Sequence, residues 1–239
     1  MGETLVDVWV YLAASPLLFL TMTLVAYQAA TWLYRKAGST ALLNPVFLTV
    51  AAIVAVLTLT GTSYPTYFEG AQFIHFLLGP ATVSLAIPLY RQFDRVRESA
   101  LAVAASLFAG ALTALASAIG LGFLLRADAV SLVSMAPKSV TAPVAMGIAE
   151  KLGGLPSLTA VFVIATGILG ASLGPVLLDL MGIRDPAARG FAMGTASHGI
   201  GTARALQESE IAGAFSGLAM GLNALATAII LPLLWTFLF

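Results

Sequence analysis

Three side chains that could bind or relay charge lie in apolar segments of this sequence: Lys138, His198 and Arg204. Lys138 lies in SMAPKSVTAP, and the other two lie in GTASHGIGTARALQE, residues 194–208. An ammonium, a guanidinium and an imidazole favour binding of an anion, above all a carboxylate. An ammonium in the middle of a bilayer costs about 2.5–3.5 kcal/mol, and no acidic residue lies within one helical turn of Lys138. A bound anion is therefore the partner we expect for Lys138.

A purely structural role stays open for each of these side chains. Lys138 could reach a membrane interface or pair with Asp179 or Glu150. Arg204 could be an ordinary loop-facing arginine before Glu208 and Glu210 that meets a need for charge on the cytoplasmic side. His198 could bind a substrate or carry a proton, or it could donate to a backbone carbonyl and have no contact with a ligand.

Proline, glycine and hydroxyl residues surround these positions and predict interrupted helices. Proline removes a backbone donor and clashes with the preceding turn, and the freed backbone groups must find new partners inside a membrane. We predict one break at Pro80, Thr82 and Ser84, a second at Pro137, and a third at the glycines after His198. Interrupted helices point free amides at one place, which is how secondary transporters hold anions. The predicted substrate-binding residues are Lys138, Ser139, Thr141, His198, Gly199, Gly201, Thr202 and Arg204.

The composition defines the class of protein. The 239 residues have a mean hydropathy of +0.97, with 59% hydrophobic and 9% charged residues, whereas soluble domains are about a quarter charged. Zero net charge without a basic tract argues against nucleic acid. With no cysteine and two histidines, we expect no metal site and no cofactor. No nucleophile elbow or phosphate loop occurs, so we expect no enzyme.

Charged loops divide the chain into eight apolar segments, so the fold class we predict is an all-α integral membrane protein with broken or re-entrant helices near the membrane middle. If every segment crosses, the basic residues at 35, 36, 91, 95, 97, 151 and 204 share the cytoplasmic side, and those at 126, 184 and 189 lie outside with both termini. Segments 71–91 and 188–206 could instead enter and return. The segments are 5–33, 42–61, 71–91, 99–125, 128–150, 156–181, 188–206 and 209–238.

The sequence also repeats itself. Residues 98–119, ending in LTALASAI, resemble residues 208–229, which contain LNALATAI, at a constant shift. We predict a single transmembrane domain over 1–239, built from repeats at roughly 17–125 and 128–239. Eight crossings would make the repeats parallel, and re-entrant hairpins would make them inverted. Small residues in the matching helices favour close helix packing, which could form either the scaffold of a homodimer or a sliding surface.

Three motifs carry a resemblance to a known family. MAPKSVTAPVAMGIAEKLGG (135–154), GTASHGIGTARALQESEIAGAFSGLAMGLNA (194–224) and LLGPATVSLAIPLYRQ (77–92) resemble the LrgB/CidB family. The resemblance covers roughly residues 40–239. It implies a multi-pass protein of the bacterial inner membrane, encoded beside a small LrgA/CidA-type partner, and an antiholin-like role in murein hydrolase activity and autolysis. Plant relatives, which fuse both parts, move glycolate and glycerate, and bacterial pairs are linked to pyruvate. Because only the LrgB-like part is present here, the need for a partner stays open.

Two functions follow as expectations. The first is a secondary transporter of small 2-hydroxy or 2-oxo monocarboxylates such as glycolate, glycerate, pyruvate or lactate, moving by an elevator-type alternation and coupled, if at all, to protons or Na⁺. The alternative is an antiholin-like regulator of murein hydrolases that acts with an LrgA/CidA-type partner. We place transport first, because a Lys, a His and an Arg at helix breaks suit a carrier better than a lesion-forming protein.

Overall fold

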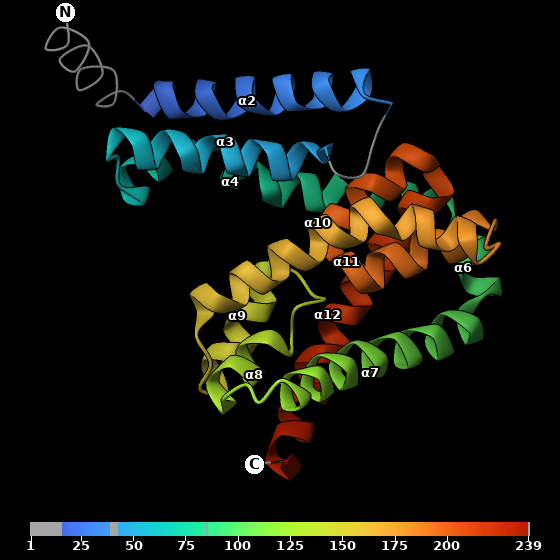
Figure 1. Cartoon of the computed structure of the whole chain (residues 1–239). Coiled ribbons are helices and arrows are strands. Elements are labelled where there is room, and N and C mark those ends of the chain that lie inside the picture. Colours follow the sequence, from blue (N-terminus) through green and yellow to red (C-terminus); the bar gives the residue numbers. More distant parts are fainter. Residues whose placement is uncertain (1–15, 39–42, 85, 239) are drawn as a thin grey trace, which may run out of the picture. The chain divides into compact units, whose positions relative to one another are not determined.

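The computed structural model describes residues 16–38, 43–84 and 86–238 and is all-helical in that part of the chain (Figure 1). The described chain divides into two compact units, 1–84 and 85–239. Four described helices are long and apolar enough to cross a membrane: Leu17–Lys36, Ala100–Leu124, Pro156–Leu180 and Glu210–Phe237. The class predicted from composition, an all-α multi-pass membrane protein, therefore matches the structure.

The first unit contains α2 (Pro16–Lys36), α3 (Pro45–Thr60) and α4 (Tyr64–Ser84), with α2 packed against both others. Asn44 starts α3 by accepting hydrogen bonds from the amides of Val46 and Phe47, and Gly61 ends it in a left-handed conformation. α4 continues through Pro80 and ends at Ser84, whose hydroxyl donates to the Ala81 carbonyl. The helix that holds Pro80, Thr82 and Ser84 therefore does not break at Pro80. It ends four residues later.

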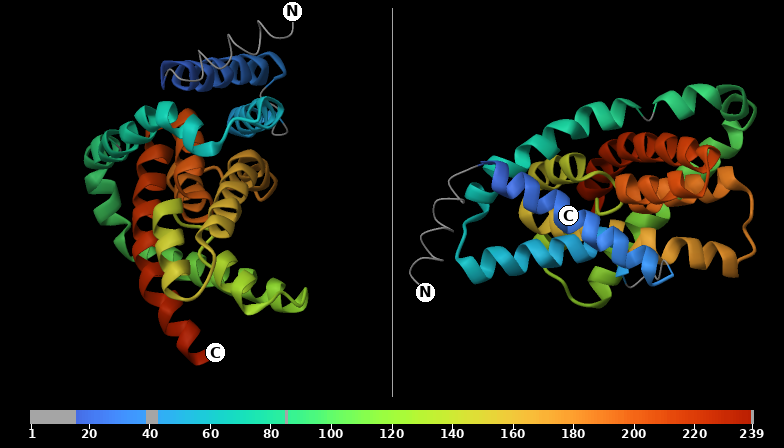
Figure 2. Two further views of the ribbon diagram at one scale, coloured as in Figure 1. Left: turned by 90° about the vertical axis from the view of Figure 1, so that its left-hand side faces the viewer. Right: turned by 90° about the horizontal axis from the view of Figure 1, so that it is seen from above.

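The second unit holds the other two predicted breaks. Its elements are α5 (Ala86–Arg91), α6 (Phe93–Glu98), α7 (Ala100–Leu124), α8 (Ala129–Met135), α9 (Ala142–Lys151), α10 (Pro156–Leu180), α11 (Pro186–Glu208) and α12 (Glu210–Leu238). α7 and α10 each have 25 residues and α12 has 29. α11 packs along α12 (Figure 2). Leu115, Ile119 and Leu231 belong to an apolar core shared by α7, α9 and α12.

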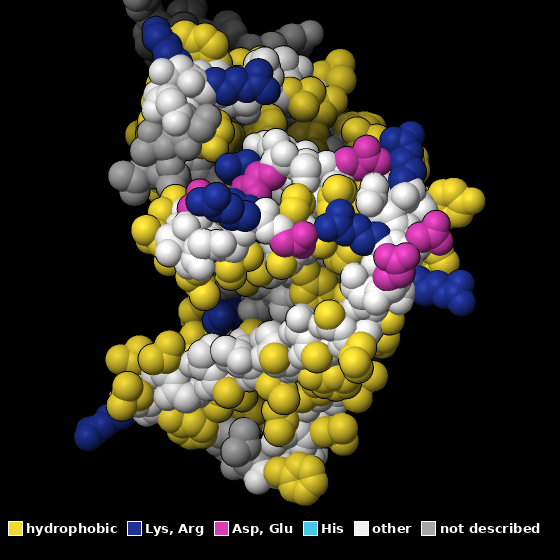
Figure 3. Space-filling view, turned by 90° about the vertical axis from the view of Figure 1, so that its right-hand side faces the viewer, with side chains coloured by type: hydrophobic (Ala, Val, Ile, Leu, Met, Phe, Trp, Pro, Cys, Tyr) yellow, Lys and Arg dark blue, Asp and Glu magenta, His cyan; other side chains and the backbone are white. Residues whose placement is uncertain are grey.

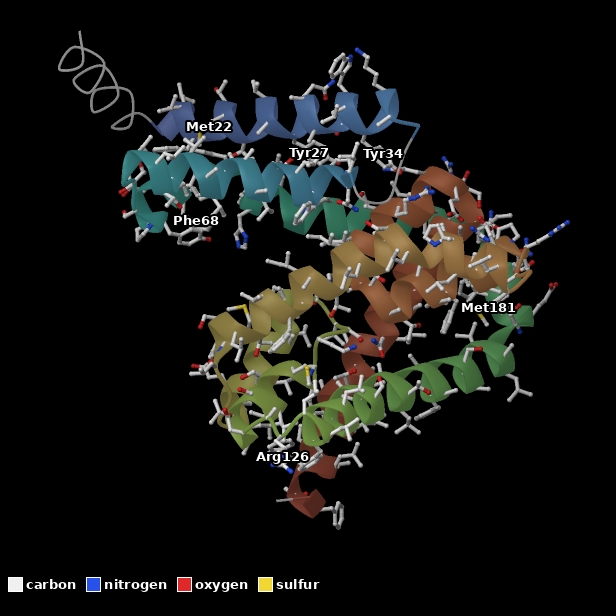
Figure 4. The ribbon with its side chains drawn as sticks, in the orientation of Figure 1. Met22, Tyr27, Tyr34, Phe68, Arg126 and Met181 are labelled. Carbon is white, nitrogen blue, oxygen red and sulfur yellow. The ribbon has the colours of Figure 1, made fainter. Side chains whose placement is uncertain are left out.

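Ion pairs bring the charged loops of the second unit together at one end, which we call the charged end. Arg91 pairs with Glu210 at 3.3 Å and Arg95 with Asp185 at 3.0 Å. Acidic and basic side chains gather on this face (Figure 3). Arg126, after α7, lies at the opposite end from Met181, after α10 (Figure 4). The starts of α7, α11 and α12 and the end of α10 therefore share one end.

α11 folds back on itself at His198, so its two ends both lie at the charged end. His198 has φ 41° and ψ −133°, which interrupts the helix. Arg189 Nε lies 3.0 Å from Glu208 Oε2, 19 residues further on, whereas a straight helix would separate them by about 28 Å along its axis. Segment 188–206 therefore does not run straight through the unit, and Arg189, in the first turn of α11, lies at the same end as Arg95.

The α8–α9 segment approaches from the opposite end. The Leu155 amide, at the start of α10, donates to Ser134 Oγ near the end of α8 at 2.8 Å. Asp128 starts α8 by accepting from the Ser131 amide, and this bond lowers the pKa of the Asp128 carboxyl. Two short helices then enclose a non-helical stretch over 136–141. The described part of this unit thus has three long helices and, between them, two interrupted segments that start from opposite ends.

Candidate functional site

The break in α11 holds the His198 ring against α10. His198 is 5% exposed, and its Nε2 lies 3.0 Å from the Val163 carbonyl oxygen. Because a carbonyl can only accept, Nε2 carries the proton and donates. Gly167 makes this contact possible, since a Cβ there would lie 2.7 Å from the His198 ring. Nε2 therefore makes the hydrogen bond to a backbone carbonyl that the purely structural interpretation of His198 predicted. Nδ1 is the ring nitrogen left for another partner.

Glycine lets the two arms of α11, residues 186–197 and 199–208, lie in contact. A Cβ on Gly201 would lie 2.6 Å from both the Met193 carbonyl oxygen and Ser197 Cβ. Gly199 meets only Met220 Sδ, at 3.8 Å. Of the two predicted binding glycines, Gly201 is thus buried between the arms, while Gly199 has space beside it.

Thr202 uses its hydroxyl within the protein. Thr202 Oγ1 donates to the His198 carbonyl at 2.9 Å and lies 2.9 Å from Ser216 Oγ on α12. Because a hydroxyl has one proton, Ser216 donates to Thr202 in this pair. The predicted role of Thr202 as a donor to a substrate therefore requires this hydrogen bond to open.

The break between α8 and α9 is a tightly turned stretch that contains Lys138. Lys138 N donates to Met135 O at 3.1 Å, and Val140 N donates to Pro137 O at 3.2 Å. Pro137 is fully buried and Ser139 is 5% exposed. Thr141 is the N-cap of α9 but makes no side-chain cap bond. The first amides of α9 are therefore not capped by Thr141.

Asn223, in the middle of α12, joins the two interrupted segments. Its Nδ2 lies 3.0 Å from Thr195 O, in the first arm of α11, and 3.5 Å from Ser139 O. Asn223 is 1% exposed, and its Oδ1 has no hydrogen-bond partner among the described residues. Ser197 Oγ, beside the other break, is also buried without a partner there. The structure thus places two unsatisfied polar atoms beside the helix breaks.

The two predicted cations occupy different surroundings. Lys138 is half-buried and makes no ion pair among those found in the described part of the chain. Arg204 lies 3.7 Å from Glu208, one turn further along the same arm, and its side chain is 29% exposed. Arg204 therefore has an acidic neighbour within α11, whereas Lys138 has no ion-pair partner among the described residues.

The predicted residues are divided between the two units. Pro80, Thr82 and Ser84 belong to the first unit. The predicted substrate-binding residues all belong to the second: Lys138, Ser139, Thr141, His198, Gly199, Gly201, Thr202 and Arg204. In the described residues, no group of three or more His, Asp or Glu side chains could hold a metal ion.

Sequence reasoning missed Asn223, Ser216 and the carbonyl of Val163. Asn223 carried a readable signal, since an amide in the middle of a 29-residue apolar helix is expensive unless it has partners. The Val163 carbonyl had no signal, because a backbone group is the same at every position.

α10 carries a stripe of small residues: Gly167, Gly170 and Gly174. A Cβ on Gly170 would collide with Ser197.

We call the buried group formed by Asn223, Ser197 and the carbonyls of Thr195 and Ser139 the polar centre. The fold and this polar centre define a multi-pass helical membrane protein with two interrupted segments around a buried asparagine. Comparison with known proteins gives the family: residues 23–237 match the LrgB-like family, and the chain belongs to it. No solved structure matches the chain significantly.

Relatives cover nearly the whole chain. Uncharacterized protein YxaC of Bacillus subtilis is 37% identical over 226 residues, which is 94% of this chain and 98% of that protein. Holin-like protein CidB of Staphylococcus aureus strain N315 is 34% identical, covering 91% and 95%. Antiholin-like protein LrgB of Bacillus subtilis is 29% identical, covering 91% and 94%. These names support the antiholin-like expectation better than carboxylate transport, the function that the sequence alone had favoured.

Proposed function

We propose that this chain acts in the bacterial plasma membrane as a holin-like or antiholin-like protein that modulates autolysis. Its membership of the LrgB-like family carries this proposal. The names of CidB and LrgB, both similar over more than nine-tenths of this chain, support it. A small LrgA/CidA-type membrane protein is the partner that we propose, and the role requires neither an enzymatic step nor a cofactor.

A complementation assay tests this role. The chain is expressed in a Bacillus subtilis strain that lacks its own LrgB, with and without the neighbouring small membrane protein. Detergent-induced autolysis and murein hydrolase activity are then followed. We expect the chain to change the lysis rate at least twofold towards that of the parent strain. An unchanged rate in both backgrounds, with the protein present in the membrane, would contradict the proposal.

A second candidate is transport of a small monocarboxylate, and the polar centre of the second unit favours it. Helix ends at 135 and 197 bring carbonyls to this centre, and helix starts at 142 and 199 bring amides. Half-buried Lys138 has no ion pair among the described residues. Transporters bind anions at such half-helix starts near the bilayer midplane. In this proposal, α8–α9 and α11 are re-entrant hairpins that enter the membrane from opposite sides.

The proposed mechanism assigns each group a task. Lys138 neutralises the carboxylate, and the free amides of the first turn of α9 and of the second arm of α11 donate to its oxygens. Arg204 takes part once it leaves Glu208. The hairpins move as a block in an elevator-type alternation, a homodimer supplies the fixed scaffold, and protons or Na⁺ drive uptake. The charged end, with Arg91, Arg95 and Arg189, faces the cytoplasm by the positive-inside rule.

Uptake into proteoliposomes tests this candidate. We expect radiolabelled lactate or glycolate to accumulate, and Lys138→Met to lower the initial rate at least tenfold, because the carboxylate loses its counter-charge. Arg204→Lys keeps the charge but loses the planar fork, so we expect a similar loss if Arg204 contacts the substrate. Lys151→Met, at the exposed end of α9, is the control and should transport normally. Equal rates for Lys138→Met and the unsubstituted protein would contradict a substrate contact for Lys138.

A further inference from the structure

We propose that Asn223 is the residue that distinguishes 2-hydroxy carboxylates from other carboxylates, with its Oδ1 accepting a hydrogen bond from the ligand's hydroxyl. This inference rests on the second candidate function, carboxylate transport. It adds a specificity determinant that lies outside the two stretches, 134–143 and 194–208, from which the binding residues were predicted.

The position of Asn223 supports a role at the centre of the site. It lies near the middle of α12 (Glu210–Leu238), the helix that packs against both interrupted segments. Its amide group donates to Thr195 O in the α11 hairpin and approaches Ser139 O in the 136–141 stretch. In the described part of the second unit, Asn223 is therefore a side chain that contacts both segments at once.

The orientation of its amide leaves one atom without a partner. Because both neighbours are carbonyl oxygens, the NH₂ group must face them, and Oδ1 faces away. Asn223 is 1% exposed, and Oδ1 makes no hydrogen bond among the described residues. A buried acceptor without a donor is costly. A ligand that brings a donor to this atom gains what the protein alone does not supply.

The chemistry of the surroundings identifies the donor. A carboxylate has only acceptors, so it cannot satisfy Oδ1. A metal cation is disfavoured, because no group of three or more His, Asp or Glu side chains among the described residues could hold one. Thr202 and the Nε2 of His198 already donate to carbonyls within the protein. A ligand hydroxyl would satisfy this unpaired acceptor, and Lys138, next in sequence to Ser139, is the cation that we assign to the ligand's carboxylate.

Three ligands of nearly equal size test this assignment. Lactate, pyruvate and propionate are all three-carbon carboxylates. At the second carbon, lactate carries a hydroxyl, pyruvate carries a keto oxygen and propionate carries no oxygen. Isothermal titration with the full chain in lipid nanodiscs measures their dissociation constants. We expect lactate to bind about tenfold more tightly than either other ligand, because only lactate donates to the buried acceptor.

Variants separate this role from a structural one. Asn223→Ala should bind all three ligands within about twofold of one another, because the acceptor is gone. Ser216→Ala, on the same helix, removes a buried hydrogen bond to Thr202 and should keep the preference for lactate. Preference for lactate that persists in Asn223→Ala would overturn the inference. If Asn223→Ala does not fold, the unsubstituted protein still decides: equal affinities for lactate and propionate overturn the assignment of Asn223 alone, and no binding of any carboxylate overturns the transport proposal with it.

Discussion

The two interrupted segments of the second unit bring backbone to the same asparagine, yet they are built differently. The first is a non-helical stretch over 136–141 with a buried proline, Pro137, between two short helices. The second turns at one residue, His198, and its arms are held together by side chains. A proline interrupts a helix by local covalent geometry, while a turn at a histidine with positive φ persists only if tertiary contacts hold it.

Packing shows the same contrast. Gly190 and Gly194 of α11 lie directly against the backbone of α12, at Ala212 and Ser216. Gly147 of α9 has nothing within 4 Å of the place where a Cβ would be. The second segment is therefore fixed by close helix contact and by ion pairs at the charged end. The first is fixed by its own turn and by its buried residues, such as Val140, 1% exposed.

Substituting the packing glycines should give the largest effect. A Cβ on Gly194 would lie 2.8 Å from Ser216 Cα, so we expect Gly194→Ala to lower the free energy of unfolding by about 3 kcal/mol. Gly147→Ala, in open space, should be neutral or stabilise by up to about 1 kcal/mol, because alanine favours a helix. Thermal unfolding in detergent, followed by intrinsic fluorescence, measures both. Equal effects would mean that the two segments do not differ in packing.

The second-largest loss of stability should come from breaking the ion pairs that hold the two ends of α11 together. Arg189 contacts Asp179 and Glu208, and the side chains of Arg189 and Glu208 are 13% and 19% exposed. Arg189→Met should destabilise by about 2 kcal/mol, because Glu208 loses its shorter ion pair in a partly buried place.

Arg91→Met is the matched control for Arg189→Met. Arg91 and Glu210 are 65% and 48% exposed, so this substitution should change stability by less than about 0.5 kcal/mol. Denaturation midpoints in a mild detergent compare the two variants at low and high salt. If Arg91→Met lowered stability as much as Arg189→Met does, the Arg189–Glu208 ion pair would have no special role in holding the two arms of α11 together.

Substitutions of the two residues at the turns themselves should destabilise less than Arg189→Met. His198→Ala loses a buried hydrogen bond to Val163 O and should cost about 1 kcal/mol. His198→Gly should cost less, because glycine accepts the positive φ without strain. Thr141→Ala should be nearly neutral, since Thr141 makes no side-chain cap bond. Melting temperatures of the three variants would rank them, and a Thr141 effect above that of His198→Ala would reverse the comparison.

The sequence predicted much of the secondary structure. The predicted segments 99–125, 156–181 and 209–238 correspond closely to α7, α10 and α12, because long apolar runs between charged loops have few alternatives in a membrane. The segment 128–150 proved to be two short helices around Pro137, as its proline predicted. Residues 5–15 of the first segment lie outside the described residues. The two repeats and their orientation stay predictions.

By itself, the sequence determined the class of protein, its long helices, its family and the helix breaks near Lys138 and His198. Hydropathy, proline and glycine predict these features because they act locally along the chain. Tertiary structure alone decided that α11 turns back at His198, that Arg204 lies beside Glu208, and that Asn223 joins segments from opposite ends of the unit. The physical reason is that these features depend on which carbonyls and carboxylates a side chain meets across the fold, and spacing along the chain does not specify such partners.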